Sequence, residues 1–137
     1  MNDITTYLFD FAVDHGIAIV LTDKLKPTTP SCAVPRLKKI IINNAWHNQK
    51  ELPFQIAHEM AHVLNNDEGV LYYSSQVTHC KVENAANDKA VDMLMQYADE
   101  KFGLPDSYVT FMETYGIPFT RYRHVRRRYV SYCCGRR

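Results

Sequence analysis

The distribution of apolar residues in the first third of the chain predicts one helix followed by two strands. Apolar side chains recur at helical spacing in residues 3–14, and Gly16 follows as a stop. Residues 17–22 and 37–43 are short apolar runs rich in β-branched residues, which is typical of strands. The segment between them, residues 23–35, contains three prolines, so we interpret it as a connecting loop that can hold a short extended piece.

The same criterion predicts a mainly helical second half. A helix is expected to begin within residues 48–53, where an asparagine and a glutamate three residues later resemble a capping box, and to continue to about Asn65. Residues 70–79 are aromatic and β-branched, which favours a third strand or an ordered loop. A long amphipathic helix is predicted over residues 80–102 and a shorter one over residues 106–116. We therefore expect an α+β fold with a small, mostly antiparallel sheet of about three strands packed against two principal helices.

The composition is that of a soluble globular protein. The chain has 137 residues, of which 46% are hydrophobic and 23% are charged. No apolar run approaches the roughly 20 residues of a membrane span, and the N-terminus lacks the features of a signal peptide. We expect a cytoplasmic protein with no membrane contact. The four cysteines include no C-x-x-C pair, so reduced thiols are expected.

The charge is unevenly distributed along the chain. Residues 117–137 contain seven arginines and no acidic residue, whereas the remainder carries nine basic against fifteen acidic side chains. We therefore predict a single domain over residues 1–118 and a basic, arginine-rich tail over residues 119–137. Three roles stay open for this tail: contact with nucleic-acid phosphates, pairing with the acidic body, or exposure to solvent. Nucleic acid is the least favoured partner.

The most informative stretch is "HEMAH", residues 58–62. Residues four apart lie on the same face of a helix, so His58 and His62 can present ring nitrogens to one metal ion at about 2 Å. Glu59 lies about 100° around the helix, where it can take a proton from a water activated by the metal. The alternative is that His58 and His62 are ordinary helix histidines, that Glu59 is a solvated glutamate, and that their spacing arose by chance.

Two histidines do not hold zinc stably, so a third ligand is expected. The metzincin extension is absent, because Asn65 and Glu68 occupy the positions of its glycine and third histidine. Glu83 is the best candidate, since we expect it in the first turn of the long helix with small residues nearby. It could also be a plain carboxylate at a helix N-terminus. Asn87, one turn later, could accept a hydrogen bond from a ligand histidine.

Other polar residues compete for roles near this site. His79 precedes Glu83 by four residues, and we interpret it as a hydrogen-bond donor to a developing oxyanion or as a surface residue. Tyr72 could supply the same contact, although tyrosines in strands more often serve packing. We expect Cys80 to lie in the core.

Several stretches resemble the ImmA/IrrE family of metallopeptidases. The resemblance rests on "LPFQIAHEMAHVL" and on "ENAAND", which matches the family's E-x-x-A-N/D element, and it covers roughly residues 35–118. The chain is similar to the short, single-domain members found in phages and mobile elements of Gram-positive bacteria. The resemblance implies a zincin-like fold with one zinc ion, held by His58, His62 and Glu83, and Glu59 as the catalytic base.

The resemblance also implies a partner and a cellular setting. Related proteins act in the bacterial host cytosol on helix-turn-helix repressors of the same element, cleaving them or relieving repression. If this chain cleaves such a repressor, it is a zinc endopeptidase. We expect the strand "KKIIIN" to receive the substrate as an added strand. The alternative is a non-catalytic, zinc-containing antirepressor that inactivates the repressor by binding. An intact Glu59 favours the enzyme.

Overall fold

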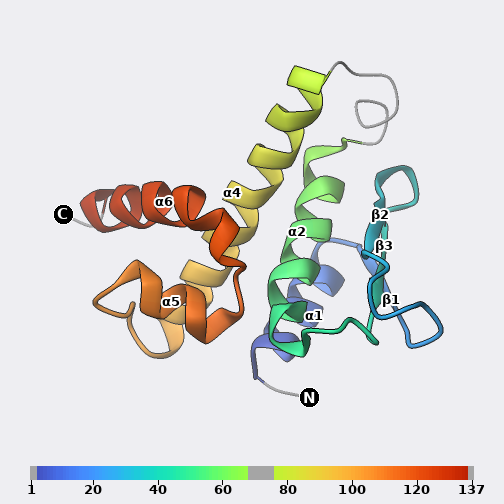
Figure 1. Cartoon of the computed structure of the whole chain (residues 1–137), viewed down its shortest axis with the longest axis horizontal. Coiled ribbons are helices and arrows are strands. Elements are labelled where there is room, and N and C mark those ends of the chain that lie inside the picture. Colours follow the sequence, from blue (N-terminus) through green and yellow to red (C-terminus); the bar gives the residue numbers. More distant parts are fainter. Residues whose placement is uncertain (1–2, 68–75, 136–137) are drawn as a thin grey trace.

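The computed structural model describes residues 3–67 and 76–135. Two long helices, α2 and α4, run side by side through the middle of the molecule (Figure 1). A small sheet lies on the α2 side, and α5 and α6 lie beyond α4 (Figure 1). The elements are α1 (Asp3–Asp14), β1 (Ala18–Thr22), β2 (Cys32–Val34), η1 (Pro35–Leu37), β3 (Lys39–Asn43), η2 (Gln49–Glu51), α2 (Leu52–Asn65), α4 (Gln76–Lys101), α5 (Tyr108–Tyr115), η3 (Phe119–Arg121) and α6 (Tyr122–Gly135).

The predicted α+β class is confirmed, but the sheet differs from the prediction in two respects. Its order is β1-β3-β2, in which β3 pairs parallel with β1 and antiparallel with β2, so the sheet is mixed rather than mostly antiparallel. Its third strand is β2, which comes from the proline-rich segment. Residues 76–79, predicted as strand or loop, begin α4 instead, and the rest of that segment, residues 70–75, lies outside the described residues.

A buried asparagine fixes the proline-rich loop against the central strand. The Asn43 side chain is fully buried, and its amide donates to the carbonyl oxygens of Lys26 and Thr29 at 2.8 and 2.7 Å. The Ser31 hydroxyl accepts from the Asn43 backbone N–H and donates to Gln55 on α2, both at 2.9 Å. These bonds hold the start of β2 beside α2, where a substrate groove can form.

Small residues let α2 and α4 approach closely. Ala57 and Ala61 of α2 and Ala86 and Ala90 of α4 are completely buried. Helix axes separate less when the contact residues are small, so polar side chains on the same faces are brought within reach of each other. The helix α2 ends at Asn66, which adopts the left-handed conformation with φ of 54°.

The arginine-rich segment is helical and packs onto the rest of the molecule. Val125 and Tyr129 of α6 are buried in the same hydrophobic cluster as α2 and α4. Of the roles left open for its arginines, pairing with acidic residues is observed for Arg127 and Arg128, which contact α4. The division at residue 118 stays a prediction. None of the helices in the described ranges has both the length and the apolar character of a transmembrane span.

Candidate metal centre

Three side chains from two helices converge at the contact between α2 and α4. The Nε2 atom of His58 lies 2.9 Å from Oε2 of Glu83. The Nε2 atom of His62 lies 3.2 Å from that of His58 and 3.4 Å from Oε1 of Glu83. The structure therefore brings together all three residues that the sequence predicted as ligands.

The spacing of these atoms fits a metal ion. Around a tetrahedral zinc ion with ligands at about 2.0–2.2 Å, neighbouring ligand atoms lie about 3.3–3.6 Å apart. The observed separations of 2.9, 3.2 and 3.4 Å are close to that spacing. Imidazole nitrogens and a carboxylate are electron-pair donors, and together they favour a cation at their centre. Three protein ligands leave one tetrahedral position open for water or substrate.

The local geometry explains how the chain places these ligands. His58 and His62 are four apart on α2 and therefore share a face. The helix α4 begins at Gln76 rather than Cys80, so Glu83 is its eighth residue and not part of its first turn. The helix dipole acts within the first turn, so it does not account for a carboxylate at this position.

The electrostatics of the group also favour positive charge. Burial lowers the pKa of His62, but hydrogen bonds with Glu83 and Asp67 outweigh it and raise that pKa to about 9. Hydrogen bonds with His58 and His62 hold the pKa of Glu83 well below its usual range. Burial raises the pKa of Glu59 to about 7, against the lowering effect of the two histidines.

Asp67 is a residue that sequence reasoning missed. Its Oδ2 lies 3.1 Å from Nδ1 of His62, and both residues are buried. A carboxylate on the outer nitrogen fixes the ring so that the inner nitrogen faces the ligand position. The sequence predicted that the helix ends at about Asn65 and gave no sign of this contact. The chain reaches Asp67 only after the left-handed turn at Asn66.

The side chain of Asn87, predicted for that same supporting role, makes no hydrogen bond among the described residues. It is buried, and both polar atoms of its amide lack a partner. The Nδ1 atom of His58 is likewise buried without a partner. The predicted bond between Asn87 and a histidine is therefore not formed, although an unused acceptor and an unused ring nitrogen are both present at the site.

The remaining predicted site residues fall at or beyond the limits of the described structure. Tyr72 lies outside the described residues. His79 belongs to α4 by its backbone, but its side chain lies outside the described part, so its oxyanion role stays a prediction. Cys80 is exposed, so its predicted core position is wrong.

A pocket of about 540 Å³ opens onto the three ligands and Glu59. One wall is the edge strand β2, represented by Cys32 and Ala33, and another is the turn that contributes Pro118 and Arg121. The strand β3, predicted to receive the substrate, is central and is paired on both sides, so it has no free edge. That prediction is wrong, and among the described residues β2 is the edge strand that borders the pocket.

A comparison with protein families agrees with this geometry. The family model described as the IrrE N-terminal-like domain, a peptidase family (M78), matches residues 12–120. This range includes the sheet, α2, α4 and α5. No curated protein and no solved structure matches the chain.

Proposed function

This chain is a member of the IrrE N-terminal-like peptidase family, and from that premise we propose that it is a zinc-dependent endopeptidase. The observation that carries the proposal is the convergence of His58, His62 and Glu83, with Glu59 beside them, in one open pocket. Structural zinc sites use four protein ligands, whereas catalytic sites use three and keep a position open. A purely structural site would also have no use for a half-buried carboxylate, Glu59, next to its ligands.

The residues divide the chemistry between them. His58, His62 and Glu83 would hold the zinc ion, which would supply Lewis-acid chemistry to the scissile carbonyl and to water. The Glu59 carboxylate takes a proton from the attacking water and later donates it to the nitrogen of the leaving amine. Asp67 accepts the hydrogen bond from His62 and keeps its ring oriented.

The pocket suits an extended substrate. Because β2 is the edge strand that lines the pocket, a peptide can pair with its free backbone groups and lie across the ligands. Such pairing needs the amide hydrogens of the peptide. A substrate peptide with single N-methylated amides should therefore lose cleavage at the methylated positions that face β2. Equal cleavage of all methylated peptides would contradict strand pairing.

The proposed substrate is a helix-turn-helix repressor of the same genetic element, cleaved in the cytoplasm to relieve repression. The support for this partner is the resemblance of "LPFQIAHEMAHVL" and "ENAAND" to the ImmA/IrrE proteins. Nucleic acid is not proposed as a partner, because Arg127 and Arg128 are engaged by acidic residues of α4.

The deciding experiment compares the zinc-loaded wild type with Glu59→Gln. Both are incubated with the repressor encoded nearby, and fragments are identified by mass spectrometry. We expect the substitution to lower the cleavage rate about 10²–10⁴-fold with unchanged zinc content, since it removes only the general base. The matched control is Glu113→Gln, an exposed glutamate remote from the pocket, which should cleave as the wild type does. Equal relief of repression by wild type and Glu59→Gln without fragments would support the binding antirepressor instead.

A further inference from the structure

One wall of the pocket carries a cationic side chain that the proposed chemistry does not use. Arg121 lines the pocket together with the metal ligands, and it is exposed. Within the described ranges its guanidinium has neither an ion pair nor a side-chain hydrogen bond. It is also the only lysine or arginine among the described residues that line the pocket.

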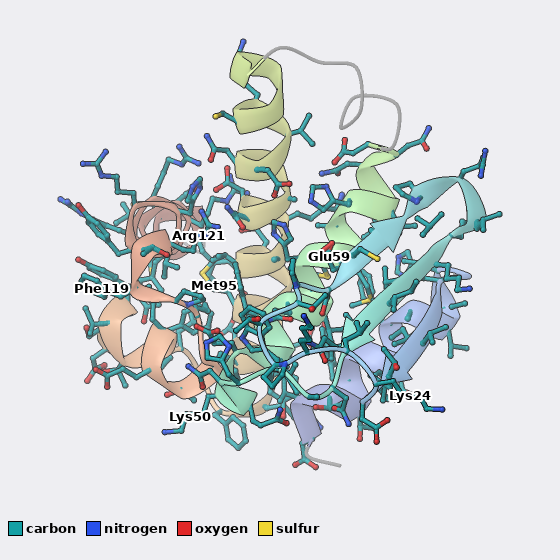
Figure 2. All side chains as sticks on the ribbon, turned by 45° about the vertical axis from the view of Figure 1, so that its right-hand side comes forward. Lys24, Lys50, Glu59, Met95, Phe119 and Arg121 are labelled. Carbon is teal, nitrogen blue, oxygen red and sulfur yellow. The ribbon has the colours of Figure 1, made fainter. Side chains whose placement is uncertain are left out.

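The other charged side chains in this pocket are acidic or belong to the metal centre. Glu83 is one of the three predicted ligands, and Glu59 lies beside them. The carboxylate of Glu51 accepts a hydrogen bond from the Trp46 indole at 2.8 Å. In Figure 2, Glu59 and Arg121 belong to two different elements, α2 and the turn that precedes α6. A zinc ion at the centre would offset the negative charge of Glu59 and Glu83, so an acidic group entering the pocket is attracted at the wall that holds Arg121.

The backbone that carries Arg121 is held in place, although its side chain is free. Gly116, with φ of 66°, packs so closely on η2, which directly precedes α2, that a Cβ atom there would lie 1.6 Å from the Lys50 carbonyl oxygen. The Arg121 backbone N–H donates to the Pro118 carbonyl oxygen at 2.9 Å. On the C-terminal side, buried Val125 anchors the first turn of α6. The fixed backbone keeps the Cα atom of Arg121 at a constant place on the pocket wall, which limits the region that its guanidinium can reach.

We propose that Arg121 forms a subsite that selects a substrate residue with a carboxylate side chain, aspartate or glutamate, at one fixed position from the scissile bond. A guanidinium can bind a carboxylate through two parallel hydrogen bonds, which gives orientation as well as attraction. This inference rests on the proposed peptidase function, since the subsite has meaning only if a peptide occupies the pocket. Arg121 acts on substrate binding and takes no part in proton transfer.

The test uses the full-length, zinc-loaded protein and a library of proteome-derived peptides, with cleavage sites read by mass spectrometry. Cleavage by Glu59→Gln is subtracted as background. The variants are Arg121→Gln and Arg121→Glu, and the matched control is Arg123→Gln. Arg123 is equally exposed and two residues away, but it does not line the pocket.

The wild type should show acidic residues enriched roughly threefold or more at one position. Arg121→Gln should lose this enrichment, Arg121→Glu should replace it with lysine and arginine, and Arg123→Gln should keep it. A peptide from the library and its Glu-to-Gln analogue then separate binding from chemistry. Arg121→Gln should lower kcat/KM for the acidic peptide roughly three- to tenfold more than for the neutral one, through KM rather than kcat.

The outcomes separate this inference from the proposed function. Cleavage by the wild type without a preference for acidic residues, or with a preference that Arg121→Gln retains, would overturn the subsite and leave the peptidase intact. Equal loss for both peptides would show a general disturbance of the pocket and would also overturn it. No cleavage by the wild type above the Glu59→Gln background would overturn both proposals. Matching thermal unfolding of the variants verifies that the exposed substitutions leave the fold unchanged.

Discussion

Helix α4 presents carboxylates to two neighbouring helices, and the two contacts are completed in different ways. Toward α6, Asp88 lies 3.0 Å from Nδ1 of His124 and 2.6 Å from Nη2 of Arg127. Asp92 binds Arg128 through two hydrogen bonds of 2.9 and 2.5 Å. Asp88 and Asp92 therefore each have a basic or cationic partner on α6.

Toward α2, the same helix presents Glu83 to two histidines whose inner nitrogens face each other at 3.2 Å. All three groups offer electron pairs to a common point, so together they could hold a cation from outside the chain. The comparison teaches a simple distinction. Asp88 and Asp92, matched by arginine, serve cohesion between helices, whereas Glu83, matched by two histidines that face one point, marks a candidate metal position.

The largest effect should come from removing the α4 ligand. Structural zinc sites contribute about 10–16 kcal/mol over four ligands, or roughly 2.5–4 kcal/mol per ligand. Glu83→Ala should therefore weaken zinc binding by about 10²–10³-fold in a competition assay with a chromophoric chelator. Asp88→Ala, on the α6 side of the same helix, should leave zinc affinity unchanged. Equal zinc affinity of Glu83→Ala and the wild type would eliminate Glu83 as a ligand.

The next effect tests whether the α6 contact belongs to the folded core. Tyr129 is buried beside Phe111, with ring centroids 6.1 Å apart. Tyr129→Ala should lower the free energy of unfolding by about 3 kcal/mol, measured by urea denaturation, without changing zinc affinity. Val130→Ala, at an exposed position of the same helix, should change it by less than about 0.5 kcal/mol. If Tyr129→Ala were as stable as the wild type, residues 119–137 would behave as a separate tail.

A smaller effect on zinc affinity should come from replacing Asp67, which orients the ligand His62. The Asp67 carboxylate contacts the outer nitrogen of His62, so its loss disturbs ring orientation and leaves all three ligands in place. Asp67→Ala should weaken zinc binding about 10–100-fold, less than Glu83→Ala does. Asp92→Ala serves as the control aspartate and should bind zinc normally. A weakening as large as that of Glu83→Ala would mean that Asp67 does more than orient the ring.

The smallest effect belongs to the ion pair between Arg128 and Asp92. Both side chains are more than a third exposed, at 37% and 40%, so solvent screens their attraction. A double-mutant cycle with Arg128→Ala and Asp92→Ala should give a coupling free energy of about 0.5–1 kcal/mol. The coupling should shrink in 1 M salt, where the screening length falls to about 3 Å. A coupling that survives high salt would show that the pair is held by packing rather than by charge.

The sequence by itself determined the features that depend on local spacing. The four-residue interval between His58 and His62 places both on one face of any helix, and the apolar period predicted α1 and α2 with nearly their observed bounds. The candidate third ligand was also found from the sequence, although its place on α4 was misjudged because that helix starts four residues earlier than predicted.

Only the tertiary structure decided the contacts between distant segments. Asp88 meets Arg127 across 39 residues, β2 rather than β3 became the edge beside the pocket, and Arg121 reached the pocket wall. Hydrophobic periodicity shows which face of an element is buried but not which element covers it. Those pairings depend on how the alanine-rich faces of α2 and α4 pack together. They also depend on which part of the α4 surface is left for α6 to contact. The residues of the metal centre could therefore be read from the sequence, whereas the walls of its pocket could not.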